Sequence, residues 1–523
     1  MISAIVRREI QDNLLSFKFI ACVLVSVILA GASTVASTGA YRDRLKEYDK
    51  GVISARDALA KVPVYSYLQA TVYRKPSVLS IFVPGVESRA GSHTTISHQE
   101  IPATLEGGPK KNEFASVFSF FDLSAIIVAV LTILAILLSY AGISEEKESN
   151  LLSLVLSNAV PKSRILAGKY LGGLISLAIA LAICFITSSL VLLFSPDVAL
   201  DSGFYVSFGI IFVFALFYLS VILLFGIFIS CLAKSSFQSV VIALAFYLIS
   251  IFLLPLLVNS LADGASNRIA RDSGRNVDAL LDKRYGEAED MEKAIPAKRS
   301  WLFAKSISAN SSLFGRLNPP ETLAHYEAYF EKAEKLKVDY AQKAFALRQA
   351  AQLSQAKIDR LRNTALALSP AFCFSRAAEL EAETGREGLA SYFREMTLYW
   401  HQYIRYLDEK NAFSLRFFYP YPRELPHSDK ALVENLSRFV AEGKEPMWRS
   451  PVYREISARN REYEAQIVPL DLADLPLFVE HKDDLAQRAT AWLPSVLVLA
   501  VENIVFFALA YFAFARLDPR MDR

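Results

Sequence analysis

Apolar residues along the 523-residue chain gather in six long runs that are separated by polar stretches. A helix needs about 20 predominantly apolar residues to cross a hydrocarbon core of roughly 30 Å. Each of the six runs meets this length. We therefore predict six transmembrane helices, at residues 17–38, 117–142, 170–194, 205–232, 237–259 and 491–515.

The first run has an alternative interpretation as a cleaved signal peptide, because Arg7 and Arg8 precede it and small residues follow it. A signal peptide has an apolar core of about 7 to 15 residues, and this run is longer. Five further runs follow. We favour a membrane span over a signal peptide.

Basic residues beside the spans predict how the chain is oriented, because Lys and Arg near span ends are retained on the cytoplasmic side. The only charged residues in the connection at 195–204 are Asp197 and Asp201. The segments on the other side carry Arg7, Arg8, Lys147, Lys162, Arg164, Lys169, Lys234, Arg516, Arg520 and Arg523. We expect a multi-pass protein of the bacterial inner membrane with both termini in the cytoplasm.

This topology leaves two long segments outside the membrane, at 39–116 and 260–490. Residues 321–369 contain no Gly or Pro and predict a helix of about 70 Å if it is continuous. At 389–407, apolar and aromatic residues recur every three or four positions, which is typical of a helix face. We favour core packing over a binding surface for this stripe, and a turn over a partner-facing patch for FFYPYP at 417–422.

The predicted fold is an all-α membrane protein with six transmembrane helices and a large, mainly helical extracytoplasmic domain. Its parts are an amphipathic N-terminal segment and first span (1–38), a first outer segment (39–116), the second span (117–142), a cytoplasmic coupling loop (143–169), the third to fifth spans (170–259), the large outer domain (260–490), and the last span with a tail (491–523).

Composition adds little chemistry to this fold. Hydrophobic residues make up 53% of the chain and the net charge is only +3, so we expect no nucleic-acid partner. Four scattered cysteines predict no disulfide framework. His93 and His98 form the only close histidine pair, and we favour a solvated loop over a metal site there. Gly168-Lys169 lacks the pattern of a phosphate-binding loop. We expect a non-catalytic subunit that binds no metal or cofactor itself.

The stretch between the second and third spans is the most informative. Charged residues at 145–148 come first, an apolar segment at 151–156 follows, and Pro161 breaks the chain before the basic start of the next span. This order predicts a short amphipathic helix at the inner membrane surface, tethered to two spans. A push on that helix would tilt both spans.

This stretch resembles the coupling signature of ABC-2 type permeases, E-K-E-S-G-T-L followed by L-S-x-P-V-x-R and G-K. The matching residues are Glu146, Lys147, Glu148, Ser149, Leu152, Leu156, Ser157, Val160, Arg164, Gly168 and Lys169. Asn150, Leu151 and Ala159 depart from it. The segments RKPSVLSIFVPGVESR, SPAFCFSRAAELEAETG, DLADLPLF and FARLDPR resemble the branch of the family with large extracytoplasmic insertions after the first and fifth transmembrane helices.

The resemblance implies a complex with two copies of an ABC ATPase subunit, which hold ATP and magnesium, and with a second permease, identical or homologous. The residues it assigns to ATPase coupling are Glu145, Glu146, Lys147, Glu148, Ser149, Asn150, Leu152, Leu156, Ser157, Pro161, Arg164 and Lys169.

Two hypotheses for function follow. In the first, the chain is the permease of an exporter. In the second, ATP hydrolysis moves the outer domain against a periplasmic partner without transport. Glu502 and Asn503 lie in the last span among membrane lipid, where a charge is costly. A translocation or gating contact is one interpretation of this pair, and a polar bond between helices is the other.

Overall fold

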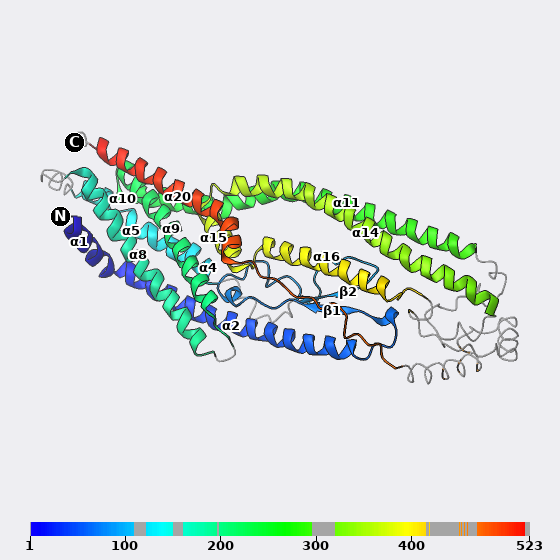
Figure 1. Cartoon of the computed structure of the whole chain (residues 1–523). Helices are drawn as coiled ribbons and strands as arrows, with labels where there is room; N and C mark the ends of the chain where they lie inside the picture. Colours follow the sequence, from blue (N-terminus) through cyan, green and yellow to red (C-terminus); the bar gives the residue numbers. More distant parts are fainter. Residues whose placement is uncertain are drawn as a thin grey trace.

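The structure is a computed structural model that describes residues 2–108, 122–149, 161–195, 198–294, 320–414 and 468–517, with a few single positions between 415 and 467. It has two parts, a bundle of apolar helices and an elongated arm (Figure 1). The first and last helices place both ends of the chain at the bundle end far from the arm, here called the terminal end.

Among the described residues, six helical segments are long and apolar enough to cross a membrane, which confirms the predicted number of spans. They are α2 (Phe17–Leu59), the α4 to α6 segment (Leu123–Glu148), α8 (Lys162–Leu193), α9 (Ser202–Leu232), α10 to α11 (Ser236–Lys293) and α20 (Leu485–Arg516). Of these, α9 is the most buried, so the others pack around it. The short amphipathic α1 (Ile2–Leu14) packs against α8.

Two of these segments each contain one turn of π-helix. The first follows α4 (Leu123–Ile126) as η3 (Ile127–Leu131) and leads into α5 (Thr132–Ser139). The second is η4 (Ile249–Leu253), between α10 (Ser236–Leu248) and α11 (Leu254–Lys293). Such turns are rare and occur mostly as single bulges within α-helices, frequently at functional sites.

The arm begins where two membrane helices continue beyond their apolar runs. The helix α2 extends to Leu59 and α11 extends to Lys293. The helix α14 (Pro320–Leu366) returns along α11, and α16 (Arg386–Glu409) lies between this pair and α2 (Figure 1). The long helix and the amphipathic helix predicted for this region are therefore both present.

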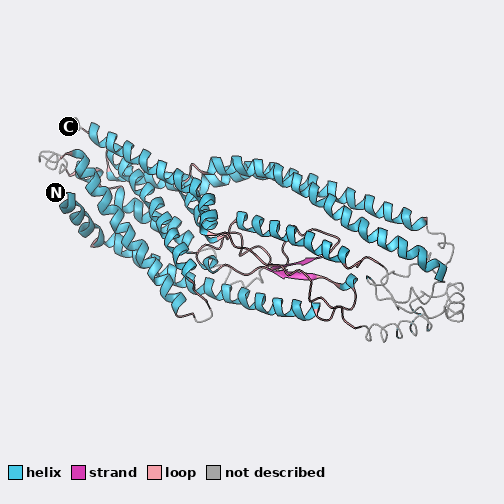
Figure 2. Cartoon of the chain, viewed as in Figure 1, coloured by secondary structure: helices cyan, strands magenta, loops and turns pink. Residues whose placement is uncertain are grey.

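A small antiparallel sheet of two strands lies inside the arm (Figure 2). It pairs β1 (Ala70–Tyr73) with β2 (His93–Ile96) and is flanked by the 3-10 turns η1 (Tyr65–Tyr67) and η2 (Val78–Ile81). The aromatic face of α16 packs onto it, and Trp400 and Tyr403 are fully buried. Trp400 Nε1 donates to the carbonyl of Ser97 at 2.8 Å. The stripe at 389–407 is a core face, as favoured from the sequence, and most of FFYPYP lies outside the described residues.

The short helix α15 (Pro370–Ala382) occupies an unexpected place, because it belongs to the segment predicted to lie outside the membrane. It packs between α9 and α20 in the bundle. Phe374 is fully buried and its ring stacks on Tyr218 in the middle of α9 with centroids 5.5 Å apart. Small residues on the same face, including Ala377 and Ala378, allow this close approach.

Candidate functional site

Three consecutive charged residues of the signature segment lie in the short helix α6 (Ser144–Glu148) at the terminal end of the bundle. Each holds a different helix. We call this group, which consists of Glu9, Glu146, Lys147, Glu148, Lys169, Ser230 and Ser236, the α6 joint.

Glu146 joins α6 to α8 and α1. Its Oε1 lies 2.7 Å from Lys169 Nζ, and the same Nζ lies 2.9 Å from Glu9 Oε1. The Lys169 side chain is only 11% exposed, and the two carboxylates are about one-quarter exposed. Because the ammonium group of Lys169 is largely buried, it is costly without charged partners. The two ion pairs therefore fix the relative positions of α1, α6 and α8.

Lys147 holds the end of α9. Its Nζ donates to the carbonyl oxygens of Cys231 at 2.5 Å and Ala233 at 3.2 Å. The last carbonyls of a helix have no partner within the helix and carry partial negative charge, so a cation at this position satisfies them and complements the helix dipole.

Glu148 accepts hydrogen bonds at the start of α10, whereas Lys147 donates them at the end of α9. It accepts hydrogen bonds from the backbone N–H of Ser236 at 3.0 Å and from the Ser236 hydroxyl at 2.8 Å. An acidic group is stabilising at a helix N-terminus. Beside it, Ser230 Oγ of α9 accepts from the backbone N–H groups of Ile143 and Ser144 at 3.0 and 2.9 Å. The start of α6 is thereby tied to α9 as well.

These contacts divide the predicted coupling residues into two groups. Glu146, Lys147, Glu148 and Lys169 are engaged with other helices. Glu145, Ser149, Pro161 and Arg164 are exposed at the surface. The remaining four predicted positions, Asn150, Leu152, Leu156 and Ser157, lie outside the described residues.

Sequence reasoning missed Glu9 as a member of the joint. The available signal was the GxxxG spacing of Gly168 and Gly172, because such pairs let helices approach closely. A Cβ on Gly168 would lie 2.6 Å from Cγ2 of Ile5, and one on Gly172 would lie 2.5 Å from Cβ of Glu9. The two glycines therefore allow α1 to pack closely against α8.

The two residues of the intramembrane pair predicted in α20 have different surroundings. Asn503 Oδ1 accepts from Ser220 Oγ at 2.5 Å, and its Nδ2 donates to the carbonyl of Phe217 at 3.1 Å. Both partners are in α9, so Asn503 makes polar bonds between helices. Glu502 Oε2 is buried and makes no hydrogen bond within the described part of the chain.

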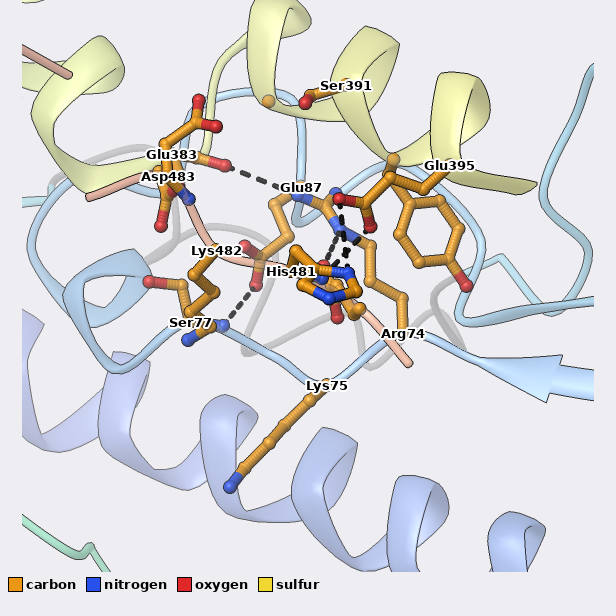
Figure 3. Close-up of a pocket in the computed structure, with 13 residues that line it drawn as sticks. Arg74, Lys75, Ser77, Glu87, Glu383, Ser391, Glu395, His481, Lys482 and Asp483 are labelled. Atoms are coloured by element: carbon orange, nitrogen blue, oxygen red, sulfur yellow. Dashed lines mark hydrogen bonds and ion pairs between the residues drawn. The ribbon is translucent and has the colours of Figure 1, made fainter. Parts of the chain in front are cut away.

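A polar cavity of about 30 Å³ lies in the arm (Figure 3). Arg74 is 9% exposed and its Nε lies 3.7 Å from Glu480, whereas the side chain of Lys75 points away from this group (Figure 3). Glu87 pairs with Arg44 of α2 at 3.1 Å. Burial raises the pKa of Glu87 and of Glu480. The volume holds only a few water molecules, so this cluster joins elements of the arm and is too small for an organic substrate.

The two histidines considered for a metal site each contact a protein group. His93 stacks on Tyr73 with ring centroids 5.0 Å apart. His98 Nε2 lies 2.7 Å from the buried carboxylate of Glu334 in α14, which also pairs with Lys337 at 2.7 Å. Burial disfavours the charged form of Glu334, but the hydrogen bond to His98 and the Lys337 charge outweigh it and lower the pKa to about 2. This group fastens the loop after β2 to α14.

The bundle, the joint and the arm together define a multi-pass helical membrane protein whose membrane helices are linked at one end by a short charged helix. The family model for ABC-2 family transporter protein matches residues 3–275, which is more than half of the chain. The protein belongs to the ABC-2 transporter family and is an ABC transporter permease. A comparison with curated proteins gave no match.

Proposed function

We propose that this chain is the transmembrane permease subunit of an ABC exporter in a bacterial inner membrane, with both termini in the cytoplasm. It works with two copies of a separate ATPase subunit, which hold ATP and magnesium, and with a second permease. Membership of the ABC-2 family supports this proposal, because permeases of this family generally work as dimers with an ABC ATPase.

The α6 joint is the observation that carries the proposal. A displacement of α6 would pull on α8 through Lys169, on the end of α9 through Lys147 and on the start of α10 through Glu148. The exposed Glu145 and Arg164 flank the joint and provide charged docking positions for the ATPase. The joint converts one push into a coordinated shift of three membrane helices.

A second candidate function is mechanical transmission to the arm without transport, and α15 is the observation that favours it. Its N-cap residue Ser369 accepts from the backbone N–H of Phe372 and donates to the carbonyl of Ser250 at 2.9 Å, within the π turn of the fifth span. The arm is thereby hydrogen-bonded to a membrane helix. A shift of α9, α10 or α20 would displace α15 and, through it, the arm.

Gentle purification of the full chain tests ATPase coupling. We expect a nucleotide-binding subunit to co-purify and to hydrolyse ATP. The double variant Glu145→Lys/Arg164→Glu should lose this subunit while the bundle remains folded, because both side chains are exposed. Arg7→Glu, an exposed charge reversal on α1, is the matched control and should retain it. Wild-type protein that brings down no nucleotide-binding subunit contradicts both candidate functions.

The mechanical alternative has its own test. Spin labels on Ile53→Cys of α2 and Leu353→Cys of α14, both exposed positions, report the width of the arm in a background without native cysteines. If ATP-driven transmission occurs, the distance between the labels changes with nucleotide. Label distances that are the same with and without nucleotide would exclude mechanical transmission and leave the exporter hypothesis.

A further inference from the structure

A hollow of about 440 Å³ opens at the terminal end of the bundle, between the end of α9 and the end of α20. Its floor is apolar and includes Phe228, Leu509 and Phe512. Phe512 and the neighbouring Leu232 are each about 60% exposed. Because both belong to helices that are long and apolar enough to cross a membrane, we expect the hollow to face the acyl chains of the bilayer.

Within the part of the chain that the structure describes, three cations line the hollow and none of the lining residues is acidic. Lys147 already donates to helix carbonyls and contributes its charge from within the α6 joint. Lys234 and Arg516 are exposed. They come from different helices, since Lys234 follows the end of α9 and Arg516 is the last residue of α20. Positive charge from three separate elements therefore converges on one apolar concavity.

The order of these groups along the membrane normal matches the shape of a phospholipid. Lys234 and Arg516 lie where the spans leave the hydrocarbon core, and the apolar floor reaches one to two helical turns deeper, at Phe228 and Leu509. We propose that the hollow binds an anionic phospholipid, with its phosphate between Lys234 and Arg516 and one acyl chain against the floor. Basic pockets between membrane helices are known to select anionic head groups.

Positive charge at span ends is also a general signal of membrane orientation. Charges that only set the membrane orientation need not surround a hollow or come together at one place. A soluble anion would use the cations but would gain nothing from an apolar floor that opens to the bilayer. The combination of charge, depth and lateral opening favours a lipid.

The test uses the full chain in nanodiscs of phosphatidylcholine with a small fraction of phosphatidylglycerol, and native mass spectrometry to count the lipids that remain bound after release into detergent. We expect the wild type to retain phosphatidylglycerol over phosphatidylcholine. Lys234→Gln/Arg516→Gln should weaken this retention about 30-fold, which corresponds to about 1 kcal/mol for each cation near an anionic surface. Lys234→Arg/Arg516→Lys keeps both charges and should retain the lipid.

Two further variants test whether lipid is retained by the hollow itself or by positive charge anywhere on this end of the protein. Arg7→Gln/Arg8→Gln removes two exposed cations of α1, outside the hollow, and should leave retention unchanged. Ala513→Phe fills the hollow without changing charge and should reduce retention. Equal loss in the α1 control, or full retention in Ala513→Phe, would overturn the proposal. Loss of a co-purifying ATPase from Lys234→Gln/Arg516→Gln with unchanged lipid retention would also overturn it and identify a protein interface.

Discussion

Replacement of Lys169 by methionine is the sharpest test of the α6 joint. Methionine preserves much of the length and apolar character of the lysine stem but removes its charge. Glu9 and Glu146 would then face each other without the cation that lies between them. The two carboxylate oxygens are at most about 5.6 Å apart, because both pair with the same Nζ, at 2.9 and 2.7 Å.

The expected loss can be worked out in two ways. At an effective dielectric constant of about 20, two unit charges at this separation repel by about 3 kcal/mol. Removing one partner of a buried ion pair costs about 3 to 5 kcal/mol, and the partial exposure of both carboxylates favours the lower end of that range. Lys169→Met is therefore expected to lose about 3 kcal/mol of stability.

The assay is unfolding of the reconstituted protein in increasing detergent denaturant, followed by circular dichroism. The matched control is Arg164→Met on the same helix, whose exposed side chain should cost little. The triple variant Lys169→Met/Glu9→Gln/Glu146→Gln removes all three charges and should recover most of the loss, because neutral groups of similar volume replace the ion pairs.

Two results would refute this reasoning. If Lys169→Met is no less stable than Arg164→Met, the ion pairs do not hold α1, α6 and α8 together. If the triple variant is as unstable as Lys169→Met alone, the loss comes from missing packing of the lysine stem and not from unpaired carboxylates.

Three further predictions concern the arm and the bundle. The pKa of Glu334 is lowered from 4.5 to about 2, so the stabilisation it provides is complete above pH 4.5 and lost as the pH falls toward 2. Glu334→Gln should cost about 3 kcal/mol at pH 7, and the difference from wild type in unfolding free energy should vanish near pH 2. Gly226→Ala should destabilise the bundle because its Cβ would collide with the side chain of Ser139, and Ser139→Gly should rescue it, as measured by the thermal midpoint. Asn503→Leu should cost about 1 to 2 kcal/mol in the same denaturant titration, since it removes two bonds between helices.

The sequence was sufficient to predict the bundle because hydrocarbon imposes a length and a composition on every segment that crosses it. It was also sufficient for the long helix of the arm, since a stretch without Gly or Pro has nothing to end it before Pro370. Helix ends were less predictable. The first span continues through Gly39 and Gly51 to Leu59, because no proline lies between residue 38 and Leu59 to end a helix that is already formed.

The place of α15 could not be read from local pattern. Its sequence contains Arg376, Glu379 and Glu381, which indicate a polar environment. Arg376 pairs with the nearby Glu387 at 2.8 Å, whereas Glu381 has long-range partners. Glu381 is fully buried, pairs with Arg488 of α20 at 3.0 Å and accepts from Trp492 Nε1 at 2.9 Å. Partners that lie more than 100 positions away in the chain cannot be predicted from the sequence around α15 alone.

The candidate site was predicted in location but not in detail. The order of charges at 145–148 marked this segment as the predicted coupling site, and the structure has the short helix α6 there. It did not show that neighbouring charges hold different helices, because this depends on where the ends of α9 and α10 lie. Lys147 meets the carbonyls at the end of α9, and Glu148 meets the backbone N–H and the hydroxyl of Ser236, only after those helices have packed.

The helix α9 connects the α6 joint to α15. Its last turn is held by Lys147 of the joint. Tyr218 in its middle stacks on Phe374 of α15 and is hydrogen-bonded to Thr132, the first residue after the π turn of the second span. Thr132 Oγ1 donates to the carbonyl of Ile127 within that turn, so Tyr218 supplies the hydrogen of its own 2.6 Å bond to Thr132. The π turns η3 and η4 both adjoin α15 or its contacts, and each interrupts the regular hydrogen-bond pattern of its helix. If ATP hydrolysis displaces the joint, we expect the shift to reach the arm through α9 and α15.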